Sequence, residues 1–137
     1  MTPILAFDIE TVPDVNGIRL LYDLPASLPD DEVVLFAQQK RRAQNGSDFM
    51  QHHLHQVVAI SCCMRWGQDK IHVGTIGEMH DSEEEMIAKF FDLIESHTPQ
   101  LVSWNGGGFD LPVLHYRALI HGIAAARYWD MGEGDFG

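Results

Sequence analysis

The sequence predicts an α/β domain in which helices cover a mixed sheet. The chain has 137 residues and is 45% hydrophobic, which is enough apolar material for a packed core. Short apolar runs typical of strands alternate with amphipathic segments typical of helices. Their order is strand, inserted helix, strand, strand, helix, strand, helix, so three antiparallel strands are followed by a parallel crossover. We expect one domain over residues 1–137.

The first part of the chain is expected to contain a strand, a long loop and a helix. An apolar run from Ile4 predicts a strand over residues 4–10. Residues 12–29 are rich in Pro, Gly and Asp and are expected to form a loop. Residues 30–42 have helical composition and carry basic residues in the last turn, where cations favour the helix dipole. The expected apolar face of this helix is Val33, Val34, Phe36 and Ala37.

The middle of the chain predicts a hairpin and a capped helix. Residues 57–64 and 70–76 are typical of strands and are separated by a polar turn. Ser82 and Glu85 form a capping box, which is the start signal of a helix. The apolar residues that follow have helical spacing and are Met86, Ile87, Phe90, Phe91 and Ile94.

The last predicted elements are a short strand and a helix. Residues 101–104 predict the strand, and Asn105 with three glycines turns the chain. The helix is expected from Asp110 to His121, with a proline in its first turn and Gly122 as its stop.

Charge and composition restrict the classes of function. The net charge of −11 argues against a broad basic surface for nucleic acid. It is compatible with a metal-dependent site, because bound cations reverse the local potential of an acidic cluster. We expect few phosphate contacts outside such a site.

Composition also bears on location. No apolar run approaches the roughly 18 residues of a membrane span, and no signal peptide is evident. We therefore expect a cytoplasmic protein without membrane contact. Cys62 and Cys63 are neighbours on a predicted strand and are poorly placed for a mutual disulfide, so both are expected to be reduced.

Three acidic residues form the candidate site. Asp8 and Glu10 are two apart on a predicted strand and so project from the same face. Adjacent carboxylates repel unless a cation lies between them, and hard oxygen ligands suit Mg²⁺ or Mn²⁺. Asp110 is the expected third ligand. The alternatives are a solvated strand end for Asp8 and Glu10, and a plain helix N-cap for Asp110.

These motifs resemble those of the DEDD superfamily of 3′–5′ exonucleases, which have a ribonuclease H-like fold. The first family motif, Asp-x-Glu on strand one, is Asp8-Ile9-Glu10 here, followed by Thr11. The second, Asn-x-x-x-Phe-Asp, extends from Asn105 to Asp110. The Trp-Asn-Gly sequence and the long stretch after strand one are similar to bacterial predicted exonucleases related to the proofreading domain of family B DNA polymerases.

The resemblance implies a two-metal phosphodiester hydrolysis at 3′ ends of single-stranded nucleic acid, with DNA as the expected substrate. Asp8 would bridge two Mg²⁺ or Mn²⁺ ions, and Glu10 and Asp110 would complete their ligation. The residues expected at the substrate are Thr11, Asn105, Gly106 and Phe109. Asn105 could instead fix its loop, the glycines could form a flexible loop, and Phe109 could be a core residue.

The chain departs from the family at its C-terminal end. The family has a third motif there, a Tyr or His followed some four residues later by a fourth metal-binding Asp. Tyr128 and Asp130 are only two apart and match it poorly. We therefore expect a truncated chain whose site lacks one carboxylate. The alternative function is a catalytically incomplete module that binds a nucleic-acid end or a partner protein. The edge of the hairpin at residues 70–76 could pair with a second copy.

Overall fold

The computed structural model describes residues 2–124, which form two compact units. The first unit contains the described residues before Thr11 and after Gln56, and the second unit is Thr11–Gln56. The assignment of residues 1–137 to one domain stays a prediction.

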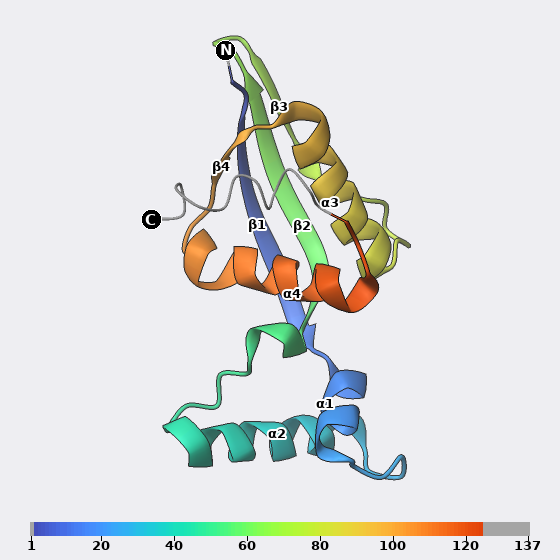
Figure 1. Cartoon of the computed structure of the whole chain (residues 1–137). Helices are drawn as coiled ribbons and strands as arrows, with labels where there is room; N and C mark the ends of the chain where they lie inside the picture. The colour runs from blue at the N-terminus through green and yellow to red at the C-terminus, as the bar shows by residue number, and fades with distance from the viewer. Residues whose placement is uncertain (1, 125–137) are drawn as a thin grey trace. The chain divides into compact units, whose positions relative to one another are not determined.

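A four-stranded mixed sheet forms the centre of the first unit (Figure 1). Its strands stand in the order β3-β2-β1-β4, with bounds β1 Ile4–Pro13, β2 His55–Trp66, β3 Lys70–Thr75 and β4 Gln100–Val102. β1 and β4 are parallel, whereas β2 and β3 form an antiparallel hairpin. The predicted mixed sheet is confirmed. β3 lies at one edge, and its pairing with a second copy stays a prediction.

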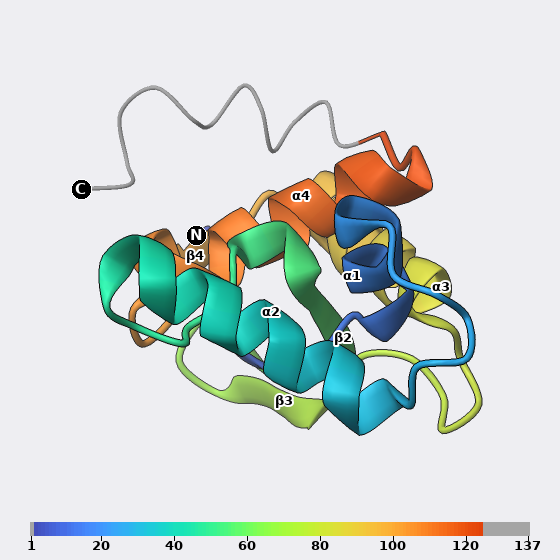
Figure 2. The same cartoon turned by 90° about the horizontal axis from the view of Figure 1, so that it is seen from below.

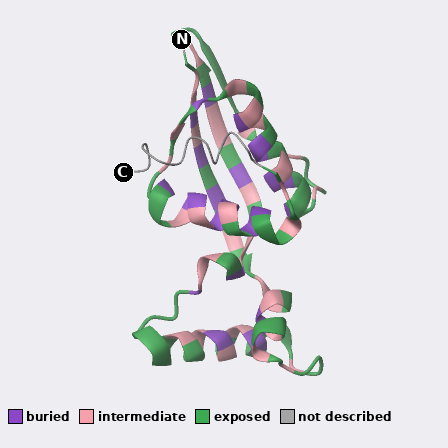
Figure 3. Ribbon diagram, viewed as in Figure 1, coloured by how far each residue is buried: buried purple, intermediate pink, exposed green. Residues whose placement is uncertain are grey.

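Helices α3, Glu83–His97, and α4, Leu111–His121, pack on one face of this sheet (Figure 1). Side chains alternate along β1, so every second residue reaches the core. Figure 3 shows the buried residues along β1, β2 and the inner sides of both helices. The fully buried members include Leu5, Ile60, Met64, Ile87, Phe90, Ile94, Val113 and Leu114.

The predicted signals at the ends of these helices are confirmed. The hydroxyl of Ser82 accepts a hydrogen bond of 3.2 Å from the backbone N–H of Glu85, as expected of an N-cap. Gly122 ends α4 with φ of 68°, a left-handed conformation in which glycine has no steric penalty.

A buried ion pair joins α3, α4 and β2. The carboxylate of Glu83 accepts hydrogen bonds from the guanidinium of Arg117, the shortest of 2.6 Å, and both side chains are 5% exposed. The same carboxylate accepts from the backbone N–H of Val57 at the start of β2. His121 Nε2 lies 2.7 Å from Glu83 Oε1. One carboxylate therefore holds three elements of the first unit together.

The second unit consists of α1, Val15–Tyr22, and α2, Asp30–Asn45, followed by a short 3₁₀ turn, His52–Leu54. Figures 1 and 2 show α1 and α2 lying against each other. Their shared core is small and contains Ile18, Val33, Ala37, Met50 and Leu54. Within this unit, the ring of Tyr22 meets the ring of Phe36 edge-on at 5.4 Å between centroids.

Two sequence predictions in the second unit are corrected by the structure. Residues 15–22 were predicted as loop but form α1, because Asp14 caps the helix by accepting from the N–H of Gly17 and because Ile18 is buried. On α2, Val33 and Ala37 are buried as expected, but Val34 and Phe36 are only half-buried. The small core offers too little surface to cover a wider helix face.

None of the helices within residues 2–124 has both the length and the apolar character needed to cross a membrane. Cys62 and Cys63 are free thiols, one packed against the core and the other on the opposite face of β2.

Replacing Glu83 tests the importance of the buried ion pair. We expect Glu83→Gln to lower the free energy of unfolding by about 3–5 kcal/mol, because the buried guanidinium of Arg117 loses the negative charge of Glu83. Urea denaturation measures this change. The control is Arg42→Ala, which removes an exposed pair with Asp48 and should cost about 1 kcal/mol or less. Equal losses in the two variants would show that the buried pair has no special role.

Candidate active site

Two residues of β1 that belong to the first unit, Asp8 and Glu10, expose their carboxylates to solvent. Phe7 and Ile9 point into the core, whereas Asp8 and Glu10 lie on the exposed side of the strand. The structure thus places the predicted Asp-x-Glu pair on one face, as the period of two requires. The two residues are held by the burial of their neighbours, which fixes the register of β1.

Asp110 reaches this region through an irregular turn between β4 and α4. Residues Gly106–Asp110 form a π-helical turn, and the N–H of Leu111 donates to the carbonyl of Gly106. Asn105 opens the turn in the left-handed region with φ of 56°. Such turns insert an extra residue into a helix and are frequent at functional sites. Asp110 is the last residue of this turn and is only 4% exposed.

The carboxylate of Asp110 does not serve as a helix cap. Its backbone is already helical, and it makes no capping hydrogen bond to α4. It accepts instead from the hydroxyl of Ser103, at 3.2 Å to Oδ2. The backbone N–H of Ile9 on β1 lies near enough to lower the pKa of this carboxyl, and the charge of Asp8 lies near enough to raise it. The interpretation of Asp110 as a plain N-cap is therefore wrong.

The surroundings of Asp110 disfavour its negative charge. Burial raises the pKa of this carboxyl, and the neighbouring charge of Asp8 raises it further. The hydroxyl of Ser103 and the backbone N–H groups of Ile9 and Asp110 lower the pKa and offset part of the rise. None of these groups is a cation. The raised pKa indicates a place where positive charge would be stabilising.

The donor set fits a hard divalent cation only in part. Asp8 and Asp110 bring carboxylate oxygens into each other's electrostatic range, and such ligands suit Mg²⁺ or Mn²⁺. Within residues 2–124, however, no group of three or more His, Cys, Asp or Glu side chains is arranged to hold a metal. Asp110 therefore lies within electrostatic range of Asp8. Among residues 2–124, Glu10 does not join these two residues in a three-residue metal-binding group.

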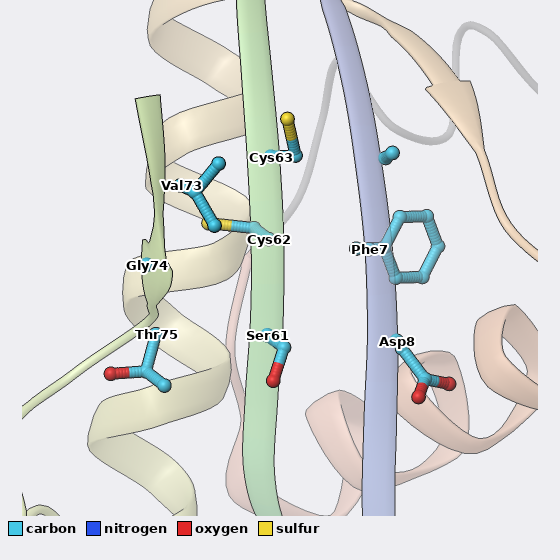
Figure 4. Close-up of a pocket in the computed structure, with 9 residues that line it drawn as sticks. Phe7, Asp8, Ser61, Cys62, Cys63, Val73, Gly74 and Thr75 are labelled. Carbon is cyan, nitrogen blue, oxygen red and sulfur yellow. The ribbon is translucent and has the colours of Figure 1, made fainter. Parts of the chain in front are cut away.

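An open depression of about 720 Å³ lies beside Asp8 on the outer face of the sheet. Figure 4 shows Asp8, Ser61 and Thr75 side by side on three adjacent strands. Cys63 and Val73 continue the floor, and Val73 is 73% exposed. The depression offers hydroxyl and apolar contacts next to the carboxylate.

The four residues predicted to contact the substrate differ in their contacts and burial. Thr11 lies in the second unit, where its hydroxyl is 3.1 Å from His55 Nδ1. Phe109 packs against the core of the first unit. Gly106 is buried, and a Cβ there would come within 2.8 Å of the Cβ of Ser103. Asn105 is exposed, and its amide lies over Gly108. Tyr128 and Asp130 lie outside the described residues.

Sequence reasoning overlooked the exposure of Trp104. Its side chain is 94% exposed, although it follows directly after Ser103, which contacts Asp110. A single exposed aromatic residue is common on protein surfaces, so its exposure alone does not assign a function. The only sequence signal was the position of the tryptophan immediately before the Asn-Gly turn.

Comparisons with known proteins identify the family of the chain. Residues 47–136 match the family described as predicted 3′–5′ exonucleases related to the exonuclease domain of PolB. The match covers more than half of the chain, and the chain belongs to this family. The matched residues include the turn that carries Asp110, whereas Asp8 and Glu10 precede them.

Short segments also match longer proteins. The chain is 40% identical over 42 residues to DNA polymerase 1 of Sulfolobus acidocaldarius and 46% identical over 44 residues to DNA polymerase 1 of Sulfurisphaera ohwakuensis. These segments are 31% and 32% of this chain but 5% of each polymerase. A solved family B DNA polymerase from Pyrobaculum calidifontis is 21% identical with a TM-score of 0.48, over 91% of this chain and 12% of that chain.

The raised pKa of Asp110 predicts a pH-dependent effect of Asp110→Asn. Between the ordinary carboxyl pKa and the raised folded one, the native state binds more protons than the unfolded state, so stability falls as pH rises. Asparagine carries no such charge. In a metal chelator we expect Asp110→Asn to be more stable than wild type at about pH 7.5, with a difference that shrinks toward about pH 4.5. Urea denaturation across this range measures it.

The matched control for this experiment is Asp92→Asn, which neutralises an exposed carboxylate on α3. We expect little change in stability from that exchange at any pH. If Asp110→Asn is less stable than wild type at neutral pH, the negative charge of Asp110 does not destabilise the folded protein, and the inference is wrong.

Proposed function

We propose that the protein is a metal-dependent 3′–5′ exonuclease that hydrolyses phosphodiester bonds at the 3′ ends of single-stranded nucleic acid, with DNA as the expected substrate. The observation that carries this proposal is that Asp8 lies close enough for its charge to raise the pKa of the buried Asp110 carboxyl. The two acidic residues are about a hundred positions apart in a chain that belongs to a family of predicted exonucleases.

The proposed ligands of Mg²⁺ or Mn²⁺ are Asp8, Glu10 and Asp110, with Asp8 shared between two ions as the resemblance implies. The bound ions would activate a water and stabilise the departing 3′ oxygen. Asp110 is suited to this role because it is buried and its carboxylate is held by the hydroxyl of Ser103. Asp8 and Glu10 are exposed and therefore accessible to the terminal nucleotide. Glu10 is also proposed to contact the 3′-hydroxyl.

Two surface features support a single-stranded substrate. The depression beside Asp8 has a volume in the range of small-molecule sites, which suits one terminal nucleotide. Trp104 offers an exposed aromatic face, and aromatic faces stack on any base without sequence preference. The net charge of −11 supports a short contact limited to the end of the strand. Asn105 and Thr11 remain proposed substrate residues.

A second candidate function is a nuclease-fold module that binds nucleic-acid ends or a protein without turnover. The observation that favours it is that Glu10 does not join Asp8 and Asp110 in a metal-binding group among residues 2–124. Such a module would bind an oligonucleotide but release no nucleotides in Mn²⁺.

Replacing Asp8 tests the proposed activity. In Mn²⁺, the wild-type protein should shorten a 5′-labelled single-stranded oligonucleotide, and Asp8→Asn should slow this roughly a hundredfold or more, because it removes the proposed bridging ligand. Denaturing electrophoresis measures the products. Asp69→Asn, in the exposed β2–β3 turn, is the charge-matched control and should retain activity. Undiminished shortening by Asp8→Asn would exclude the proposed site.

Replacing Trp104 tests the proposed stacking surface. Trp104→Ala should weaken binding of a hydrolysis-resistant phosphorothioate oligonucleotide by about 1–3 kcal/mol, whereas Trp104→Phe should retain most of the affinity. Fluorescence anisotropy measures the binding. Met79 is 93% exposed in the loop before α3, so Met79→Ala is the control for loss of an exposed apolar side chain. Equal affinity of Trp104→Ala and wild type would count against stacking.

A further inference from the structure

The side-chain hydrogen bond to Asp110 comes from a residue that the exonuclease motifs do not include. Ser103 follows directly after β4 and donates from Oγ to Oδ2 of Asp110 at 3.2 Å. Asp110 is buried and does not cap its own helix. The hydroxyl of Ser103 therefore holds one oxygen of this carboxylate in place.

The glycines of the turn explain how Ser103 approaches Asp110. A Cβ on Gly106 would lie 2.8 Å from the Cβ and 3.3 Å from the Oγ of Ser103. Real Cβ atoms do not come so close to another carbon, so any side chain at position 106 would push Ser103 away. Gly107 differs, because a Cβ there would meet nothing within 4 Å. A Cβ on Gly108 would meet the amide of Asn105 at 2.5 Å.

We propose that Ser103 is a positioning residue for the metal ligand Asp110, and that Gly106 is required because it leaves room for the Ser103 hydroxyl. This inference rests on the proposed function. The hydroxyl holds one carboxylate oxygen in place and satisfies part of its hydrogen-bonding capacity. Outer partners of this kind orient ligands, and their loss typically weakens metal affinity by about 10–100-fold.

Mn²⁺ affinity gives a direct test that does not depend on turnover. The dissociation constant of Mn²⁺ for the full chain is measured by isothermal titration for wild type, Ser103→Ala and Ser103→Thr. We expect Ser103→Ala to weaken Mn²⁺ binding on the order of tenfold. Ser103→Thr should restore it, because threonine keeps the hydroxyl. Urea denaturation in chelator establishes that each variant is folded.

The glycine pair supplies a matched comparison. Gly106→Ala should weaken Mn²⁺ binding to a similar extent as Ser103→Ala, and the double variant should bind no more weakly than either single one, because both act on one contact. Gly107→Ala introduces the same methyl group into open space and should bind Mn²⁺ as wild type does. If Gly106→Ala fails to fold, the serine variants still decide the question.

The outcomes separate the two levels of the proposal. If Ser103→Ala binds Mn²⁺ as tightly as wild type, or if threonine does not restore affinity, Ser103 is not a positioning residue, while the proposed site stands. If wild type does not bind Mn²⁺, or if Asp110→Asn binds it equally well, the proposed metal site itself is wrong and the role of Ser103 is overturned with it.

Discussion

The buried contact between Glu83 and Arg117 is the constraint on which the arrangement of the first unit depends. Both side chains are 5% exposed, so neither charge can be satisfied by water if the other is lost. Glu83 is the first residue of α3, Arg117 lies in α4, and the same carboxylate binds the start of β2 through Val57. The ion pair thus fixes the direction of α4 across the sheet. Because α4 begins at Leu111, this direction determines where Asp110 lies.

The electrostatic surroundings at the start of α4, near Asp110, differ from those around Arg117. Around Glu83 a negative charge is matched by a guanidinium, whereas around Asp110 burial and the charge of Asp8 disfavour the carboxylate. Native proteins commonly concentrate such unfavourable features at functional sites and stabilise them by packing elsewhere. The ion pair between Glu83 and Arg117 holds α4 in position, and Asp110 lies at the start of the same helix.

Local sequence signals predicted much of the first unit. The alternation along β1, the hairpin, the Ser82 cap and the Gly122 stop depend on neighbouring residues, so the sequence alone was sufficient. That Asp110 joins Asp8 and Glu10 in one site stays a prediction, and the charge of Asp8 is near enough to raise the pKa of Asp110. The roles of Ser103 and Gly106 could not be foreseen, because they depend on a π-helical turn that has no simple pattern. The helix α1 was missed because burial of Ile18 overcomes a weak local preference.

The most direct test is the location of a bound ion. A crystal of the protein grown with Mn²⁺ gives an anomalous difference peak at each manganese position. We expect a peak within about 2.0–2.6 Å of carboxylate oxygens of both Asp8 and Asp110. Manganese bound elsewhere on the chain, with these two side chains uncoordinated at saturating metal, would contradict the central claim that the sheet and α4 bring the two acids together to bind a divalent cation.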